Sequence, residues 1–402
     1  MIGLLAPGFS NDPGRFTLAV ELTRITFPYL LLVALVTLYG GMLNALGRFA
    51  SAAAAPILLN LSMIATLALA VFFPTAGHAA AWGVLIAGCL EVLLVAGDVT
   101  RQGVLPIFRW PRLDQQLKLF LKRFAPATIG SAETQIALFA DTIIASFLVT
   151  GALSALYYAD RINQLPVGVI GIAVGTVLLP EMANRIAAGD EQGARRAQNR
   201  AIELTLLLSV PCLVAFLLVP DLIMRALFLR GAFTTADAQA AAATLAAYAL
   251  GLLPFVLMRS VTVTFLARGD TITPVKALAV AVAVNVAFKI VLMGPLAQVG
   301  LALATSIGAW INLLLLLWLA KRADLIAFDP RLRRSAVRLA MAGAMLGLAL
   351  WYVGPRLSDW TRLHDEAVLA LLIVIGAIVY GGMLSMLFGR EWLALYRAAR
   401  RR

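Results

Sequence analysis

Long apolar runs alternate with short polar connections along this chain, and the pattern predicts an all-α integral membrane protein. A run of about 18 apolar residues or more is long enough for a helix to cross the hydrocarbon core of a bilayer. Eleven such runs occur, near residues 27–46, 52–73, 79–97, 126–149, 152–179, 201–219, 238–266, 274–293, 299–320, 336–353 and 367–388. An odd number of spans places the two ends of the chain on opposite sides of the membrane.

Composition supports the membrane assignment and argues against a disulfide framework or a metal site. Hydrophobic residues make up 61% of the chain and charged residues 13%, whereas soluble domains carry about 25% charged residues. Cys89 and Cys212 fall inside apolar segments, and His78 and His364 fall in predicted loops. These positions predict neither a disulfide framework nor a metal site, and no cofactor is expected.

The basic residues predict how the spans are oriented. On one alternating set of connections 24 of the 33 Lys and Arg residues gather, against 6 on the other set. The positive-inside bias makes the first side cytoplasmic, so the carboxyl terminus is predicted in the cytoplasm and the amino end of this chain in the periplasm. The net charge of +12 also predicts attraction to anionic membrane lipid. A nucleic-acid partner is not expected, because no basic soluble domain is visible.

Asp160 and Arg161 are the most informative polar positions. They lie within an apolar stretch from Leu153 to Pro180 that is long enough to cross a bilayer. A charged side chain near the bilayer centre costs at least about 2.5 to 3.5 kcal/mol, so it normally faces a cavity, a partner charge or a substrate. Adjacent residues on a helix do not face each other. A guanidinium suits phosphate, and we predict that Arg161 binds it with Asp160 holding the cavity geometry; a structural ion pair is the alternative.

Three further positions are candidates around this pair. Arg259 is predicted either as a second phosphate contact or as a side chain that snorkels to the interface. Glu133 is expected to face the same cavity, because neighbouring hydroxyl and amide residues give its helix a polar flank. Pro166 removes a helix hydrogen bond beside the charged pair, so it is either a hinge or a static kink.

The chain is predicted to divide into four parts. Between residues 101 and 123 apolar residues recur at helical spacing among basic ones, which favours an amphipathic cytoplasmic linker helix over a solvated loop. It would join the remainder of an amino-terminal lobe, 1–100, to a carboxy-terminal lobe, 124–322. A last helix pair with a basic tail would occupy 323–402. The first residues resemble the outer end of a helix whose beginning is missing.

Several motifs resemble the MurJ/MviN family of lipid II flippases. The run Tyr157-Tyr158-Ala159-Asp160-Arg161, followed by Leu165-Pro166 and Leu178-Leu179-Pro180, is similar to the eighth helix of that family. Further matches in family order are Ala6-Pro7-Gly8-Phe9, Thr26-Phe27-Pro28-Tyr29, Ala145-Ser146-Phe147-Leu148, Thr273-Pro274-Val275-Lys276 and Gly294-Pro295-Leu296.

The resemblance implies a fourteen-helix, two-lobed fold of the multidrug/oligosaccharidyl-lipid/polysaccharide exporter superfamily. It also implies outward movement of a lipid-linked peptidoglycan precursor across the bacterial inner membrane, in company with other cell-wall synthesis proteins. The eleven spans would be the fourth to the fourteenth, with the amino-terminal helices absent. The last helix pair would form a groove for the lipid tail.

The same resemblance implies a candidate cation site. Relatives in the superfamily often bind sodium or a proton at a carboxylate between helices. Asp141, Asn285 and Thr305 could complete such a site here, with the ammonium of Lys289 in the place of the cation. A buried carboxylate needs a counter-charge, which a tethered cation always supplies. The alternative is that Lys289 snorkels to the periplasmic headgroups.

Other functions remain open on the sequence alone. Within transporters the alternatives are a flippase for another polyprenyl-linked oligosaccharide and a cation-coupled drug exporter, which would favour buried acids over arginines. From other classes, a non-transporting scaffold would have no need of Arg161. A lipid-phosphate transferase would want an acidic metal motif at the membrane edge or a large periplasmic loop, and neither is visible.

Overall fold

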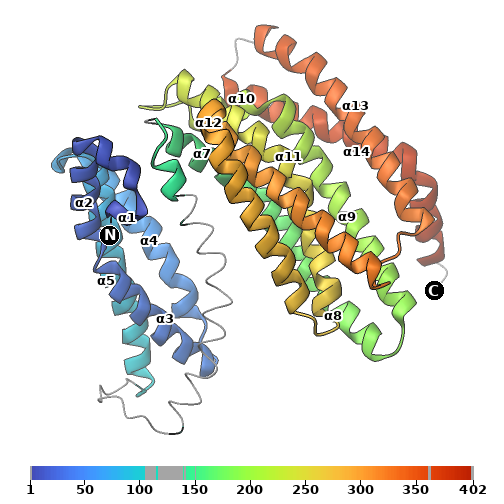
Figure 1. The fold of residues 1–402 in the computed structure, drawn as a ribbon, viewed down its shortest axis with the longest axis horizontal. Coiled ribbons are helices and arrows are strands. Elements are labelled where there is room, and N and C mark those ends of the chain that lie inside the picture. Colours follow the sequence, from blue (N-terminus) through green and yellow to red (C-terminus); the bar gives the residue numbers. More distant parts are fainter. Residues whose placement is uncertain are drawn as a thin grey trace. The chain divides into compact units, whose positions relative to one another are not determined.

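The computed structural model describes residues 2–104, 115, 139, 142–149, 151–360 and 364–399. This part of the chain is helical and contains no β-strand. It forms two compact units, Met1–Ala132 and Glu133–Arg402, drawn in Figure 1. Nine helices in the described part are long and apolar enough to cross a membrane, which confirms the all-α membrane fold. The predicted span at 126–149 and the predicted linker at 101–123 fall largely outside the described residues.

Unit 1 is a small helical bundle. Its elements are α1 (Ile2–Leu5), η1 (Pro7–Asn11), α2 (Pro13–Thr26), α3 (Tyr29–Ala45), α4 (Ala50–Ala68), η2 (Ala70–Phe72) and α5 (Ala76–Arg101). The sequence predicted a first span at 27–46, but helix already begins at Pro13. The Asp12 side chain caps that helix by accepting a hydrogen bond from the backbone N–H of Arg15, and proline suits its first turn.

Close packing and polar contacts hold the long helices of unit 1 together. At Gly83 of α5 an added Cβ would lie 2.4 Å from the Thr66 hydroxyl, so only glycine permits α4 to approach this closely. The Ser51 hydroxyl donates to Asp98 across 2.5 Å, which joins α4 to α5 again. On the other flank the Tyr29 hydroxyl lies 3.4 Å from the buried carboxylate of Glu91, linking α3 to α5.

Unit 2 is larger and is built around one buried helix. Its elements are α7 (Ala152–Pro166), η3 (Val167–Ile172), α8 (Ala173–Ala187), α9 (Glu191–Leu218), α10 (Pro220–Phe228), α11 (Thr235–Leu266), α12 (Ile272–Arg322), α13 (Pro330–Trp360) and α14 (Asp365–Ala399). Alanines dominate the first half of α11, and several of them, such as Ala238, Ala241 and Ala242, are buried, so neighbouring helices pack tightly on it. In Figure 1 α11 runs between α7, α9 and α12.

The 51 residues of α12 are two helices joined by a sharp reversal. Ala297 has φ 46° and ψ −126°, which no helix accommodates. This break falls between the predicted spans 274–293 and 299–320. The two halves lie against each other, because a Cβ on Gly308 in the second half would meet Cβ of Asn285 in the first at 2.9 Å.

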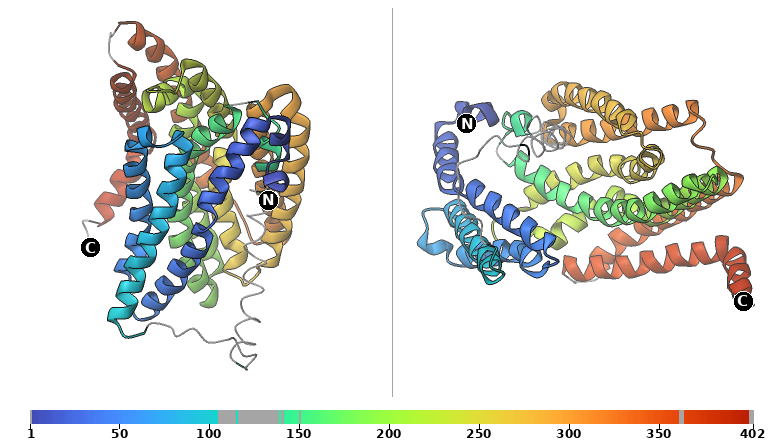
Figure 2. Two further views of the ribbon diagram at one scale, coloured as in Figure 1. Left: turned by 90° about the vertical axis from the view of Figure 1, so that its left-hand side faces the viewer. Right: turned by 90° about the horizontal axis from the view of Figure 1, so that it is seen from below.

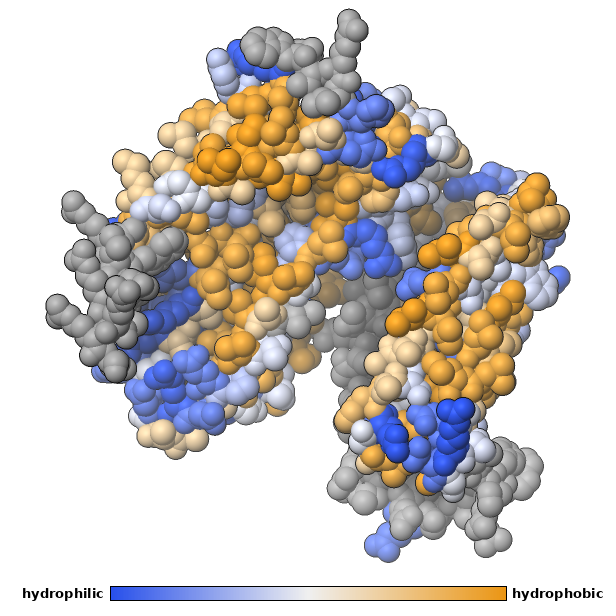
Figure 3. Space-filling model, turned by 180° about the vertical axis from the view of Figure 1, so that it is seen from behind, coloured by the Kyte–Doolittle hydropathy of each residue, from blue (hydrophilic) through white to orange (hydrophobic). Residues whose placement is uncertain are grey.

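The last two helices lie along the outside of α9. Figure 2 shows α13 and α14 side by side there, and a shared apolar cluster contains Leu339, Leu346, Leu372 and Leu384. The Tyr380 hydroxyl donates to the backbone carbonyl of Leu207 at 2.9 Å, which ties α14 to α9. Broad hydrophobic surfaces cover the helices of each unit in Figure 3, as lipid-facing helices require. The boundaries 1–100, 101–123, 124–322 and 323–402 remain predictions.

Candidate functional site

Helix α7 carries one packed face and one open polar face. Ala155, Ala159 and Ile162 are buried at helical spacing and join the core against α11. Tyr157 and Arg161 are one turn apart on the exposed side. The charged position predicted from the sequence therefore projects from the core of unit 2 and not into it.

Asp160 and Arg161 make different contacts, as their helical spacing predicts. The amide of Gln164 donates to the Asp160 carboxylate one turn away. The Arg161 guanidinium lies over the Tyr157 ring at 5.1 Å and donates to the tyrosine hydroxyl at 3.3 Å. Among the described residues Arg161 forms no ion pair. The structural ion pair, the alternative explanation for this arginine, is thus not formed in that part of the chain.

The backbone after this pair departs from regular α-helix. Pro166 is buried, and the next six residues, Val167–Ile172, form a π-helix before α8 begins. Proline cannot donate to the carbonyl four residues earlier, and a π-segment inside an α-helix is frequently found at functional sites. The structure places this irregularity within two turns of Arg161; whether Pro166 acts as a hinge stays a prediction.

Arg259 lies beside the same π-segment. A Cβ on Gly171 would lie 3.3 Å from Cγ of Arg259 and 3.9 Å from Cγ1 of Val256, so the arginine stem crosses η3 where a side chain is missing. The Arg259 residue is exposed. Within the described part of the chain its guanidinium makes no hydrogen bond or ion pair.

The candidate cation site is described in part. Asn285 donates to the carbonyl of Ala304 at 3.4 Å, which brings it beside Thr305 on the second half of α12. Lys289 is only 3% exposed, and a side chain that snorkels to solvent would show its ammonium group. Asp141 and Glu133, the other predicted acids, lie outside the described residues.

A polar column on α9 was not predicted from the sequence. Four residues at spacings of four, Glu191, Arg195, Asn199 and Glu203, each contact another element. Glu191 pairs with Arg268 at 2.5 Å, Arg195 with Asp324 at 3.0 Å, Asn199 donates to the carbonyl of Ala327 at 2.9 Å, and Glu203 accepts from Ser335 at 2.7 Å. The regular spacing of four was a visible signal for one shared helix face.

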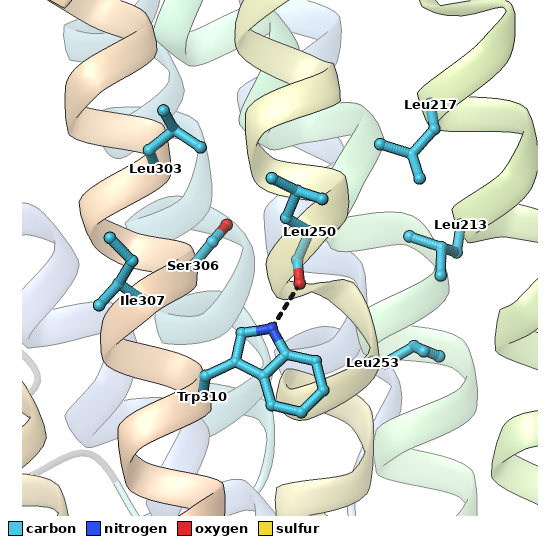
Figure 4. A pocket seen from close by; sticks show the side chains of 8 residues that line it. All are labelled: Leu213, Leu217, Leu250, Leu253, Leu303, Ser306, Ile307 and Trp310. Atoms are coloured by element: carbon cyan, nitrogen blue, oxygen red, sulfur yellow. Dashed lines mark hydrogen bonds between the residues drawn. The ribbon is translucent and has the colours of Figure 1, made fainter.

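An apolar pocket of about 360 Å³ opens over α11 between α9 and the second half of α12 (Figure 4). Its lining residues are Leu213, Leu217, Leu250, Leu253, Leu303, Ser306, Ile307 and Trp310. Both of its polar side chains are already satisfied, since Ser306 donates to the Ala247 carbonyl at 2.7 Å and Trp310 to the Leu250 carbonyl at 2.8 Å. This pocket offers a ligand no polar side chain without a partner.

Metal chemistry finds no support in the described ranges, which contain no group of three or more His, Cys, Asp or Glu side chains placed to hold an ion.

Comparisons with known proteins agree on one family. The family model described as lipid II flippase MurJ matches residues 1–365. The probable lipid II flippase MurJ of Rhizobium tropici is 40% identical over 386 residues, covering 94% of this chain and 72% of that protein. The protein of the same description from Rhizobium meliloti (strain 1021) is 38% identical over 407 residues, covering 99% and 76%.

Solved structures give the same fold. A lipid II flippase MurJ in an inward closed conformation superposes with a TM-score of 0.80 at 25% identity, covering 98% of this chain and 78% of that one. An inward-facing multidrug resistance transporter of the MATE family, in the MOP superfamily, gives a TM-score of 0.64 at 15% identity, covering 81% and 77%. The second likeness concerns the fold alone.

Proposed function

The chain belongs to the lipid II flippase MurJ family, and from this premise we propose that it moves lipid II from the cytoplasmic to the periplasmic leaflet of the bacterial inner membrane. The relatives are named as flippases, so the protein is a transporter and not an enzyme. Movement occurs by alternating access, in which a cavity opens first to one side and then to the other. The cytoplasmic carboxyl terminus and the periplasmic amino end of this chain belong to the same proposal.

One observation supports the choice of Arg161 as the phosphate-binding residue. Arg161 lies on the exposed face of a membrane-spanning helix, and its only described partner is the side chain of Tyr157. An arginine left without a carboxylate at such a depth is expensive unless the exposed face borders an aqueous cavity that an anion enters. A guanidinium has five donors, and a single tyrosine oxygen leaves most of them for a bidentate contact with phosphate. Arg161 therefore binds the pyrophosphate of the precursor.

Further groups assist in this proposal. Arg259 supplies a second phosphate contact from the far side of η3, where its stem is fixed against Gly171. Asp160, held by Gln164, fixes the position of polar groups on α7 and keeps its carboxylate away from the neighbouring guanidinium. Glu133 completes the polar lining in this scheme. Pro166 and the π-segment permit α7 to bend against α8 when the cavity changes sides.

The rest of the chain has supporting roles. The helix pair α13–α14 accommodates the lipid tail, and the basic connections on the cytoplasmic side attract anionic lipid. Other cell-wall synthesis proteins are the expected partners. A cation-coupled drug exporter shares the fold, but the open guanidinium of Arg161 favours an anionic cargo over a cationic one.

The test compares two arginines in the same local setting. Arg161 and Arg356 each stack on a tyrosine one turn earlier, Tyr157 and Tyr352. Purified protein in nanodiscs is titrated with fluorescent lipid II, with inorganic pyrophosphate as competitor. Arg161→Ala should weaken lipid II binding about tenfold or more, because hydrogen bonds to charged groups contribute about 1.5 to 3 kcal/mol. Arg161→Lys should recover only part. Arg356→Ala should bind normally; equal affinities for all three variants would remove the phosphate role of Arg161.

A further inference from the structure

A second pocket, separate from Arg161 and Arg259, lies where α7 and α11 begin. Its volume is about 220 Å³. Its lining residues are Gly151, Ser154, Ala155, Tyr158, Ala232, Phe233 and Asp237. They come from the first two turns of α7, the α10–α11 connection and the first turn of α11. The orientation predicted from the basic residues places this end of both helices at the periplasmic surface.

Aromatic rings form one side of this pocket. The rings of Tyr158 and Phe233 both line it, with centroids 4.9 Å apart and planes at 80°. Phe228 supports them from behind, at 4.7 Å from Tyr158 and 6.1 Å from Phe233. The two rings touch edge to face, and because their planes are nearly at right angles, the ring faces left uncovered point in different directions. A cation in the pocket can contact such a face, as in an aromatic cage.

A single negative charge completes the lining. Asp237 is its only ionisable group apart from the tyrosine hydroxyl. One carboxylate oxygen, Oδ2, accepts from the backbone N–H and the hydroxyl of Thr234, and Oδ1 has no described hydrogen bond. The nearby Arg230 is engaged elsewhere, since its guanidinium lies 3.3 Å from the Glu366 carboxylate.

Anions are not favoured here, although a helix begins at the pocket. The N-terminus of α11 is closed by a capping box, in which the Asp237 N–H donates to the Thr234 hydroxyl at 3.2 Å. The full negative charge of the Asp237 carboxylate therefore outweighs the partial positive charge of the helix end, which is roughly half an elementary charge. Within the described residues the hydroxyl groups of Ser154 and Tyr158 make no hydrogen bond, so both remain available to a ligand N–H.

We propose that this pocket binds an organic ammonium group, held against the Tyr158 and Phe233 rings that line it and neutralised by Asp237. The proposal goes beyond lipid II transport and does not depend on it. The small volume suits a single alkylammonium head and not a lipid tail. Such a group has two sources at this surface, an aminophospholipid headgroup from the bilayer or a primary amine on a peptide.

The test uses a paramagnetic cation as the probe. Phe233→Trp keeps an aromatic ring and adds a fluorophore, and tryptophan is the strongest partner in cation–π contacts. A nitroxide bearing a trimethylammonium group is titrated against this variant in nanodiscs of phosphatidylglycerol, beside an uncharged nitroxide. The fluorescence added by the substitution should be quenched saturably by the cationic probe and only linearly by the neutral one. Equal, linear quenching by both probes would overturn the proposal.

Further substitutions test whether probe binding depends on the charge of Asp237 or only on an intact fold. Asp237→Asn, introduced into the Phe233→Trp variant, should raise the apparent Kd of the cationic probe about tenfold. Asp237→Glu in the same variant should retain binding. Circular dichroism checks that both proteins remain helical. Tyr158→Leu should weaken the probe similarly, and Phe72→Leu, at an exposed aromatic position in unit 1, should have no effect. Unchanged affinity in both Asp237→Asn and Tyr158→Leu would refute the assigned site.

Two competition arms identify the source. Nanodiscs containing phosphatidylethanolamine should abolish saturable quenching if the lipid headgroup is the natural ligand. A soluble lysine-containing peptide should displace the probe in phosphatidylglycerol nanodiscs, with its Nε-acetylated form as control, if a peptide amine is the ligand. Displacement in either arm supports an ammonium site, and failure of every amine to compete contradicts it. Because no arm measures transport, these results are independent of the flippase assignment.

Discussion

A methyl group in place of the Gly171 hydrogen would lie 3.3 Å from Cγ of Arg259, so the arginine stem runs directly across the π-segment η3. The missing side chain at Gly171 thus leaves the space that the Arg259 stem occupies. A snorkelling arginine would need no such support, because its stem follows any apolar surface. The contact therefore offers a way to move Arg259 without removing its charge.

Gly171→Leu should displace the Arg259 stem and weaken lipid II binding about tenfold, as Arg259→Ala should, because both lose a charged hydrogen bond. The double variant should bind no more weakly than either single one, since the two changes remove the same contact. Binding is measured by titration of fluorescent lipid II in nanodiscs. Gly175→Leu is the control, because no atom lies within 4 Å of a Cβ at that position. Additive losses in the double variant would show that Gly171 acts independently of Arg259.

Pro166 provides a second prediction. Pro166→Ala restores a hydrogen-bond donor toward the carbonyl of Ile162, so α7 should become stiffer and the melting temperature should stay level or rise. If bending at this point accompanies the change of access, lipid II translocation in proteoliposomes should fall severalfold while lipid II affinity is retained. Pro180→Ala, on the exposed side of α8, is the matched control. A translocation rate equal to that of the unmodified protein would identify the proline as a static kink.

Most of the helices that were predicted correctly from the sequence were predicted from hydropathy alone. Apolar runs longer than a bilayer crossing leave little choice but helix, because every backbone polar group must be satisfied inside the membrane. The break near Ala297 was anticipated by the short gap between two such runs, which contains Gly294, Pro295 and Gln298. Helix α2 was missed, since Arg15, Glu21 and Arg24 lower its hydropathy. Its start signal, Asp12 followed by proline, was nevertheless present.

The site was predictable only where it depends on residue type. Arg161 and Asp160 are conspicuous because charge is expensive inside an apolar segment. The partners of these two residues could not be predicted from the sequence. Which residues contact Arg161 depends on which face of α7 is buried, and that face determines both the contact with Tyr157 and the absence of a described ion pair. The π-segment and the contact of Arg259 with Gly171 arise from packing between helices far apart in the sequence. No local pattern encodes either of them.

The polar column on α9 predicts a stability effect. Glu203→Ala should lower the free energy of unfolding by about 1 to 3 kcal/mol, because it leaves the Ser335 hydroxyl, 1% exposed, without its acceptor. Thermal melting in detergent, followed by circular dichroism, measures the change. Glu181→Ala breaks an exposed pair with Arg185 on α8 and should cost at most about 1 kcal/mol. Equal effects of the two substitutions would show that the α9 contact contributes no more than a surface pair.

Lys289 carries the last prediction. The side chain is 3% exposed within a membrane-spanning helix, and Asn285 lies one turn before it. A buried ammonium that neutralises a carboxylate, proposed here to be Asp141, occupies the place that a free cation would otherwise take. Lipid II translocation by the unmodified protein should then be equally fast in sodium and in potassium buffers.

Removing this charge should change the ion response. Lys289→Met keeps the volume of the side chain but leaves the carboxylate without its counter-ion, so the acid must either bind a proton or recruit sodium. Translocation by Lys289→Met proteoliposomes should therefore become dependent on sodium or on acidic pH. Lys276→Met, at an exposed position near the start of the same helix, should behave like the unmodified protein. If the unmodified protein and Lys289→Met show the same response to sodium and to pH, the ammonium does not stand in for a transported or structural cation.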